Sequence, residues 1–135
     1  MSEQDKVFWA LCVWREARSL GKAGMLAVAW VMLNRLNSKA WGPTMTDVVT
    51  APDQFDAMVI RGDPETVIWP NNHISPPDAV AWQQAQEAVS TAFSSDAQAD
   101  PTHGATNYYS KTIAAPYWVA SMTETLTVEN TVFYR

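Results

Sequence analysis

The residue of this chain best suited to acid–base chemistry is Glu16, because the sequence surrounds its carboxyl group with apolar residues. Cys12 and Val13 precede Glu16 by four and three residues, which places all three side by side on a helix. A carboxyl group removed from water acquires a raised pKa and can donate a proton near neutral pH. The pattern alone leaves other interpretations open: Glu16 can pair with Arg15 or Arg18, or lie in solvent.

Few other side chains suggest catalysis. The sequence contains no Gly-rich phosphate loop, no His-Glu-x-x-His pair and no Gly-x-Ser-x-Gly turn. His73 and His103 would hold a metal only if their two loops converged with a carboxylate, and exposed loop histidines are the simpler interpretation. Cys12 would need a neighbouring histidine to act as a nucleophile. We therefore expect no metal and no cofactor.

A second carboxylate, which ordinary glycoside hydrolysis requires, is not evident from the pattern. Several acidic residues lie in or just before a proline-containing segment, and any of them can face Glu16. A solvated loop surface explains their charge equally well. These candidates are Asp47, Asp53, Asp56, Asp63 and Glu65.

The elements that must position Glu16 are mostly helical. Apolar periodicity predicts helices over residues 5–19 and for about 15 residues from Lys22, and a short helical turn over 46–49. Ser75-Pro76-Pro77-Asp78 is typical of a helix start, and it predicts a third long helix whose inner face consists of Ala79, Trp82, Ala85, Val89 and Phe93. Residues 51–77 contain five prolines and are predicted to form a long ordered loop. Residues 108–109 suit a strand, and 125–128 with 131–134 suit a terminal hairpin.

Composition limits the class of protein. The 135 residues are 47% hydrophobic, enough for one core, and we expect a single catalytic domain over residues 1–135. The net charge of -5 argues against binding nucleic acid or an anionic membrane through bulk electrostatics. No segment is apolar enough for stable membrane insertion, and the first residues lack a basic secretory start. We expect a monomer that is cytoplasmic when synthesised.

Several blocks of the sequence, in order, resemble the cell wall hydrolase family typified by the spore cortex-lytic enzyme SleB. The opening block is Trp14-Arg15-Glu16-Ala17-Arg18, followed by the stretch from Gly24 to Arg35. Gln54-Phe55 is similar to the family's Gln-Phe element. The segment 100–109, which ends in Tyr108-Tyr109, resembles its Asp-Pro-Thr-x-Gly-Ala-x-x-Tyr-Tyr block. Pro116-Tyr117-Trp118 and residues 130–135 are similar to the family's closing blocks.

The resemblance implies a lysozyme-like α+β fold, mostly helical with a small antiparallel sheet or C-terminal hairpin. It implies an enzyme that cleaves peptidoglycan glycan strands between muramic acid and glucosamine, with Glu16 as its catalytic residue. Aromatic and amide side chains suit glycan binding. The predicted substrate-binding residues are Gln54, Phe55, Tyr108, Tyr109 and Trp118. Phe55 and Trp118 suit a core equally well, and adjacent Tyr108 and Tyr109 in a strand would point to opposite faces.

The outcome of cleavage is left open by two departures from the family pattern. Ser19-Leu20 replace a common Gly-Glu, and Thr131 stands where the family often has His. We favour a lytic transglycosylase that leaves anhydro-muramic ends; the alternatives are a muramidase-type hydrolase that uses water and a noncatalytic glycan-binding module of the same fold. A bacteriolytic phage endolysin, released from the cytoplasm to act on the host wall, is the expected setting.

Overall fold

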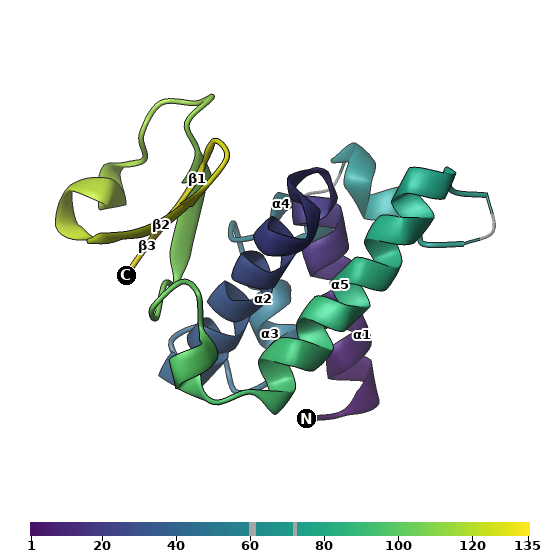
Figure 1. The fold of residues 1–135 in the computed structure, drawn as a ribbon, viewed down its shortest axis with the longest axis horizontal. Helices are drawn as coiled ribbons and strands as arrows, with labels where there is room; N and C mark the ends of the chain where they lie inside the picture. The colour runs from purple at the N-terminus through teal and green to yellow at the C-terminus, as the bar shows by residue number, and fades with distance from the viewer. Residues whose placement is uncertain (60–61, 72) are drawn as a thin grey trace.

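The computed structural model describes residues 1–59, 62–71 and 73–135, and it combines a helical body with a small sheet (Figure 1). The helices are α1 (Glu3–Ala17), α2 (Gly21–Ser38), α3 (Met45–Val49), α4 (Asp56–Val59) and α5 (Pro76–Ser94). Short 3₁₀ helices are η1 (Arg18–Leu20), η2 (Pro64–Val67), η3 (Ala97–Ala99) and η4 (Tyr117–Ser121). The strands are β1 (Asn107–Ser110), β2 (Glu124–Val128) and β3 (Thr131–Tyr134).

The long helices begin where the sequence supplies caps. Ser2 caps α1: its hydroxyl accepts a hydrogen bond from the Asp5 backbone N–H, and the Asp5 carboxylate bonds back to the cap. Ser75 caps α5 through the backbone N–H of Asp78, as the sequence predicts. Between α1 and α2, Gly21 turns the chain with a φ of 73°, a conformation that glycine adopts without strain.

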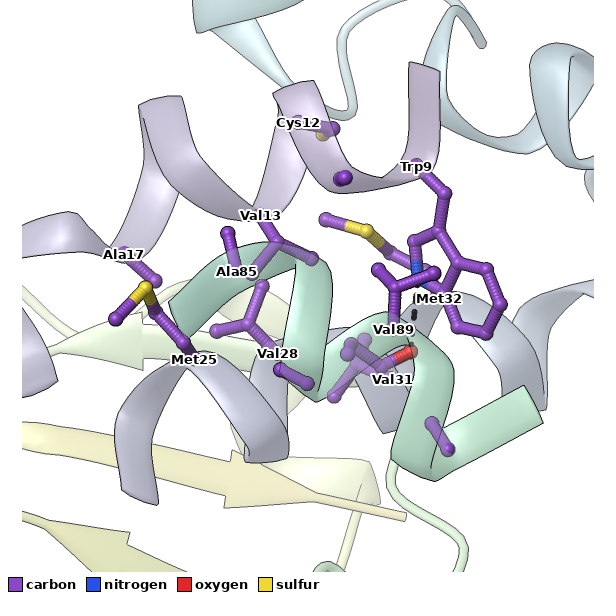
Figure 2. Close-up of a cluster of buried hydrophobic side chains, with 14 of the residues drawn as sticks. Trp9, Cys12, Val13, Ala17, Met25, Val28, Val31, Met32, Ala85 and Val89 are labelled. Atoms are coloured by element: carbon purple, nitrogen blue, oxygen red, sulfur yellow. Dashed lines mark hydrogen bonds between the residues drawn. The ribbon is translucent and has the colours of Figure 1, made fainter. Parts of the chain in front are cut away.

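The core lies where α1, α2 and α5 pack against one another, and Figure 2 shows part of it. Trp9 of α1 is fully buried and donates its indole N–H to the Ala29 carbonyl oxygen of α2 at 3.3 Å, so this polar group is satisfied inside the core. The other labelled side chains are aliphatic or sulfur-containing and come from the same three helices. The core therefore fixes α1 from several sides.

The three-stranded antiparallel sheet has the order β1-β3-β2, with β3 in the centre. All four residues of β3 are buried. The turn between β2 and β3 contains no glycine; Glu129 supplies the left-handed conformation with a φ of 51°. In Figure 1 the sheet stands beside the helical body, and the segment that carries η4 lies on the side of the sheet away from the helices.

The predicted elements are confirmed with two differences. The predicted loop over residues 51–77 contains α4 and η2, although residues 60, 61 and 72 within it lie outside the described residues. The predicted inner face of α5 is confirmed for Ala85 and Val89, which are buried, and for Trp82, which packs against the core. It is wrong at its two ends, where Ala79 is exposed and Phe93 is 47% exposed. The buried face consists of Ala81, Ala85, Ala88, Val89 and Ala92. Small residues on this face let α5 approach α1 and α2 closely.

None of the helices in the described ranges has both the length and the apolar character required to cross a bilayer.

Candidate active site

Glu16 lies in the last turn of α1, and its carboxyl group is partly buried. The helix brings it next to Cys12 and Val13, both fully buried. Burial, together with the negative charges of Asp56, Asp63 and Glu65, raises the pKa of Glu16 from 4.5 to about 7. A substantial fraction of Glu16 is therefore protonated at neutral pH.

Arg15 and Arg18, the two obvious partners for Glu16, are both engaged elsewhere. Arg15 is 7% exposed and donates hydrogen bonds to backbone carbonyl oxygens of the segment 57–68. Arg18 forms a bidentate ion pair with Glu65, with N–O distances of 2.6 and 2.8 Å. Within the described ranges, the Glu16 carboxylate has no hydrogen bond or ion pair. Both alternatives that paired Glu16 with an arginine are excluded by this geometry.

Arg35 of α2 is the cation whose charge acts on Glu16, and it lowers the pKa of that carboxyl. Its guanidinium donates to the Thr106 carbonyl oxygen at 2.6 Å and to the Gln54 side-chain oxygen at 3.0 Å. It also lies over the rings of Trp41 and Phe55, at 4.6 and 5.0 Å from their centroids. Arg35 thus joins α2, the loop that contains Gln54 and the start of the sheet around the site.

Gln54 is exposed, and the hydrogen bond from Arg35 fixes its side-chain oxygen. Its amide nitrogen donates only a long hydrogen bond, of 3.4 Å, to the Pro52 carbonyl oxygen. Gln54 can therefore offer an oriented amide N–H to a polar ligand, as its predicted binding role requires.

Tyr108 reaches the site from strand β1. Its ring packs against Phe133 of β3 with 5.5 Å between centroids. Burial raises the pKa of the Tyr108 hydroxyl well above 10, and the negative charge of Glu16 adds to this effect. The hydroxyl therefore remains protonated and can donate a hydrogen bond near Glu16. Of the predicted binding residues, Tyr108 is linked to Glu16 through the effect of its charge, and Gln54 is linked to it through Arg35.

Phe55 is a correction to the predicted substrate-binding set. It is 1% exposed and belongs to the core, where its ring supports Arg35. A ring without an exposed face cannot stack on a sugar. The sequence shows Phe55 only as an aromatic residue in a proline-containing loop, and this pattern does not distinguish a core position from a sugar-binding position.

Tyr109 and Trp118 lie together on the other face of the sheet from Tyr108. Tyr109 stacks on Tyr134 with 5.9 Å between centroids, and the Trp118 ring meets both tyrosine rings edge-on. Neighbouring residues of a strand point to opposite faces, so Tyr109 points away from the face that carries Tyr108. These aromatic contacts stabilise the η4 segment against the sheet, and neither residue is grouped with Glu16.

The segment 100–106 has a structural role. Asp100 is 5% exposed and accepts hydrogen bonds from the backbone N–H groups of Thr102 and Gly104, each at 2.8 Å. Asn34 of α2 donates to the Asp100 carboxylate at 2.8 Å and to the Ala105 carbonyl oxygen at 3.0 Å. These bonds hold the turn before β1 against α2, and this places Tyr108.

The acidic candidates separate into three groups. Asp47 caps α3 through the Thr44 backbone N–H, and Glu65 is paired with Arg18, so both are committed to structure. Asp53 has no effect on the pKa of Glu16, and its φ of 60° places it in a turn. Asp56 and Asp63 are the remaining carboxylates whose charges reach Glu16, and the Asp63 carboxylate also caps η2 by accepting the Glu65 backbone N–H at 2.8 Å.

The remaining titratable candidates lie apart from this chemistry. His73 and His103 are exposed on separate loops, and among the described residues no three His, Cys, Asp or Glu side chains form a group that could hold a metal. Cys12 is fully buried, and burial raises its pKa, so its thiol is not a ready nucleophile.

The surface has a larger and a smaller hollow, and Glu16 lines neither of these two. One, of about 1000 Å³, lies between the first turn of α1, the end of α2 and the start of α3. The other, of about 250 Å³, lies between α1 and α5. The candidate site is therefore defined by its side chains: Glu16, Arg35, Gln54, Tyr108, Asp56 and Asp63.

Sequence reasoning did not identify Arg35 as part of this site. The sequence predicts that Arg35 lies on a helix, but it does not indicate which residues Arg35 contacts. Its hydrogen-bond acceptors at residues 54 and 106 are distant in sequence. The engagement of Arg15 with the segment 57–68 was missed for the same reason.

A helical body with a partly buried, unpaired carboxyl group at the end of a core helix, beside a small antiparallel sheet, is a lysozyme-like α+β arrangement. The catalytic domain of the germination-specific lytic transglycosylase SleB from Bacillus anthracis has this fold with a TM-score of 0.76 and 26% identity, and the match covers 100% of this chain and 97% of that one. The SleB catalytic domain from Bacillus cereus matches with a TM-score of 0.77 and 26% identity, and the match covers 100% of this chain and 92% of that one. The fold class predicted from the sequence is confirmed.

The family model described as Cell Wall Hydrolase matches residues 20–134, and the chain belongs to this family. It is 31% identical over 120 residues to a spore cortex-lytic enzyme of Halalkalibacterium halodurans, covering 89% of this chain and 31% of that protein. It is 32% identical over 118 residues to the spore cortex-lytic enzyme of Oceanobacillus iheyensis, and the match covers 87% of this chain and 37% of that protein. The chain thus spans about a third of the length of these relatives. Glu16 precedes the matched range, so its assignment stays a prediction that rests on the site geometry.

Proposed function

We propose that this chain cleaves the glycan strands of peptidoglycan between muramic acid and glucosamine as a lytic transglycosylase, with Glu16 as the single acid and base. Membership of the cell wall hydrolase family supports the substrate class. The description of the B. anthracis neighbour as a lytic transglycosylase supports the reaction type. The observation that carries the proposal is the partly buried Glu16, which has a pKa of about 7 and no hydrogen bond or ion pair to any described residue.

In the first step, protonated Glu16 donates its proton to the glycosidic oxygen. The bond between the muramic C1 and this oxygen breaks, and the glucosamine portion leaves with a new hydroxyl. Positive charge develops on the muramic ring, and the Glu16 carboxylate, now ionised, stabilises it. A carboxyl with a pKa near the working pH suits this step because it is readily protonated and still acidic enough to donate.

In the second step, the Glu16 carboxylate accepts the proton of the muramic 6-hydroxyl while that oxygen bonds to C1. The product is a 1,6-anhydro-muramic end, and Glu16 is again protonated. The attacking hydroxyl belongs to the same sugar, so its effective concentration is high and no protein nucleophile is needed. In this scheme Gln54 and the Tyr108 hydroxyl hydrogen-bond the sugar beside Glu16.

The reaction type is tested by mass analysis of the digest. Purified peptidoglycan should release fragments that end in anhydro-muramic acid, each 18 Da lighter than the reducing fragment, since no water is added. A digest that contains only reducing muramic ends would refute the transglycosylase assignment and establish hydrolysis in its place. Digestion in ¹⁸O-labelled water provides the control, because only hydrolysis incorporates the label.

A muramidase-type hydrolase is the second candidate, and the carboxylates of Asp56 and Asp63 favour it. Their charges reach Glu16, so either can act as the second carboxylate that activates water. Under this mechanism Asp56→Asn or Asp63→Asn would abolish cleavage, whereas a transglycosylase would retain it.

The pH dependence of cleavage should reveal the protonation state of Glu16. The first step requires the protonated acid, so we expect the rate to fall as the pH rises through about 7, the pKa of Glu16. The measurement is the initial rate of turbidity loss of a peptidoglycan suspension from pH 5 to 9 at constant ionic strength. A rate that rises through pH 7 would show that the ionised carboxylate starts the reaction, contrary to the proposal.

A further inference from the structure

Trp69 is a large aromatic side chain that the core leaves exposed close to the candidate site. It is 52% exposed, and Val67 beside it is 76% exposed. Val67 is the last residue of η2, and Trp69 lies just after it. Aromatic residues are usually buried in a chain of this size, so an exposed indole near the helical turn that carries Glu16 suggests a role in binding.

Arg15 places Trp69 near Glu16. The Arg15 guanidinium lies 4.8 Å from the centroid of the Trp69 ring and covers one face of it. Arg15 directly precedes Glu16 on α1, so the indole lies within one arginine side chain of the helical turn that carries the acid. Although Arg15 lies over the ring, half of the Trp69 side chain is still exposed, so the indole keeps surface on which a ligand can pack.

The backbone around Trp69 is also fixed. The Ile68 carbonyl oxygen accepts two hydrogen bonds from Arg15, at 3.1 and 2.9 Å, and the Trp69 carbonyl oxygen accepts one from the Asn71 N–H at 2.8 Å. The Arg18–Glu65 ion pair anchors the same segment at η2. A ring held in this way loses little conformational freedom when a ligand packs on it.

We propose that Trp69 is a sugar-binding platform that stacks on a pyranose ring of the glycan strand, a short distance from the bond that Glu16 cleaves. The inference rests on the proposed function, since the ligand is the same polysaccharide. A pyranose presents a flat face of C–H groups that packs on an aromatic ring, and the contact requires no charge on the sugar. A long strand extends past the cleaved bond in both directions, so a sugar next to the reacting pair can reach the indole.

The experiment measures binding without cleavage. The Glu16→Gln protein is mixed with purified insoluble peptidoglycan, and the bound fraction is measured by sedimentation over a range of peptidoglycan concentrations. Adding Trp69→Ala should weaken binding about three- to tenfold. Adding Trp69→Leu, which keeps an apolar side chain but removes the flat ring, should weaken it as much, and Trp69→Phe should restore most of it. Thermal denaturation followed by circular dichroism verifies that each variant is folded.

Phe93→Ala is the matched control. Phe93 is 47% exposed, and the Lys6 ammonium lies 4.9 Å from the centroid of its ring, so Phe93 resembles Trp69 in exposure and in its contact with a cation. Lys6 lies in the first half of α1, whereas Glu16 lies in its last turn. This variant should bind as the Glu16→Gln parent does. Equal binding by the Trp69→Leu and parent proteins would overturn the platform.

Failure of the platform and failure of the proposed function give different results. If the Glu16→Gln protein binds peptidoglycan but the unmodified chain does not cleave it, the proposed function is refuted and the binding role of Trp69 is not. If the unmodified chain cleaves peptidoglycan and Trp69→Leu changes neither KM nor binding, the binding role of Trp69 is refuted and the proposed function is not. A rise in KM with an almost unchanged kcat for Trp69→Leu supports the platform, because a remote sugar contact holds substrate without touching the reacting atoms.

Discussion

Replacing Glu16 by Gln should reduce the cleavage of peptidoglycan about a thousandfold, because the amide can neither donate the proton to the glycosidic oxygen nor take one from the 6-hydroxyl. The side chain keeps its size, so the surrounding core is unaffected. The rate is measured by turbidity loss of purified peptidoglycan and by chromatography of the released fragments. A Glu16→Gln protein that clears the suspension as fast as the parent would show that another group is the acid.

Stability provides the control that separates a catalytic role from a structural one. Burial raises the pKa of Glu16 in the folded state from 4.5 to about 7, so the folded protein binds more protons than the unfolded chain between these pH values. Stability is therefore lost as the pH rises through this window, and above pH 7 the ionised carboxylate destabilises the fold by about 3 kcal/mol. Glu16→Gln removes that cost, so the variant should melt higher than the parent at pH 8. If it melts lower there, Glu16 supports the fold.

The parent protein also decides between an enzyme and a noncatalytic module. A folded parent that binds peptidoglycan and never releases fragments would show that the chain is a glycan-binding module of this family. The same assay with Asp47→Asn, whose carboxylate caps α3 on the surface, controls for loss of activity through any change of charge.

Replacing Arg15 by Met should destabilise the protein by about 3 kcal/mol, because the change removes the donors that satisfy several carbonyl oxygens of the segment 57–68. Methionine preserves most of the volume, so the effect reports lost hydrogen bonds rather than a cavity. The measurement is denaturant-induced unfolding at pH 6. Lys6→Met is the control, since its ion pair with Glu3 is exposed and is expected to contribute less than about 1 kcal/mol.

The Arg15 variant should also change the chemistry of Glu16. Arg15→Met releases the carbonyl oxygens of Ala57, Thr66 and Ile68 while the Arg18–Glu65 ion pair remains, so we expect the segment to loosen and water to reach the Glu16 carboxyl group. Hydration favours the ionised form, so the pH at which cleavage is half-maximal should fall below about 7. An unchanged pH midpoint in an otherwise destabilised Arg15→Met protein would show that Arg15 supports the fold alone.

Local sequence determined where most elements begin. Ser2 and Ser75 cap α1 and α5 through neighbouring residues, and the alternating pattern at 125–134 predicted the hairpin. The same local logic failed at the two ends of the inner face of α5, at Ala79 and Phe93. Phe93 has the hydrophobicity of a core residue, but the helix turns its row of alanines inward because close packing against α1 and α2 requires small side chains.

The sequence alone determined that Glu16 has apolar neighbours, because Cys12 and Val13 lie one helical turn before it on the same helix. Tertiary structure decided that this carboxyl group pairs with neither Arg15 nor Arg18. Arg15 and Arg18 are adjacent to Glu16 in sequence, but their hydrogen-bond acceptors lie some 40 to 50 residues away in the segment 57–68. Contacts between residues so distant in sequence depend on how the helices and loops pack, and no local pattern encodes them.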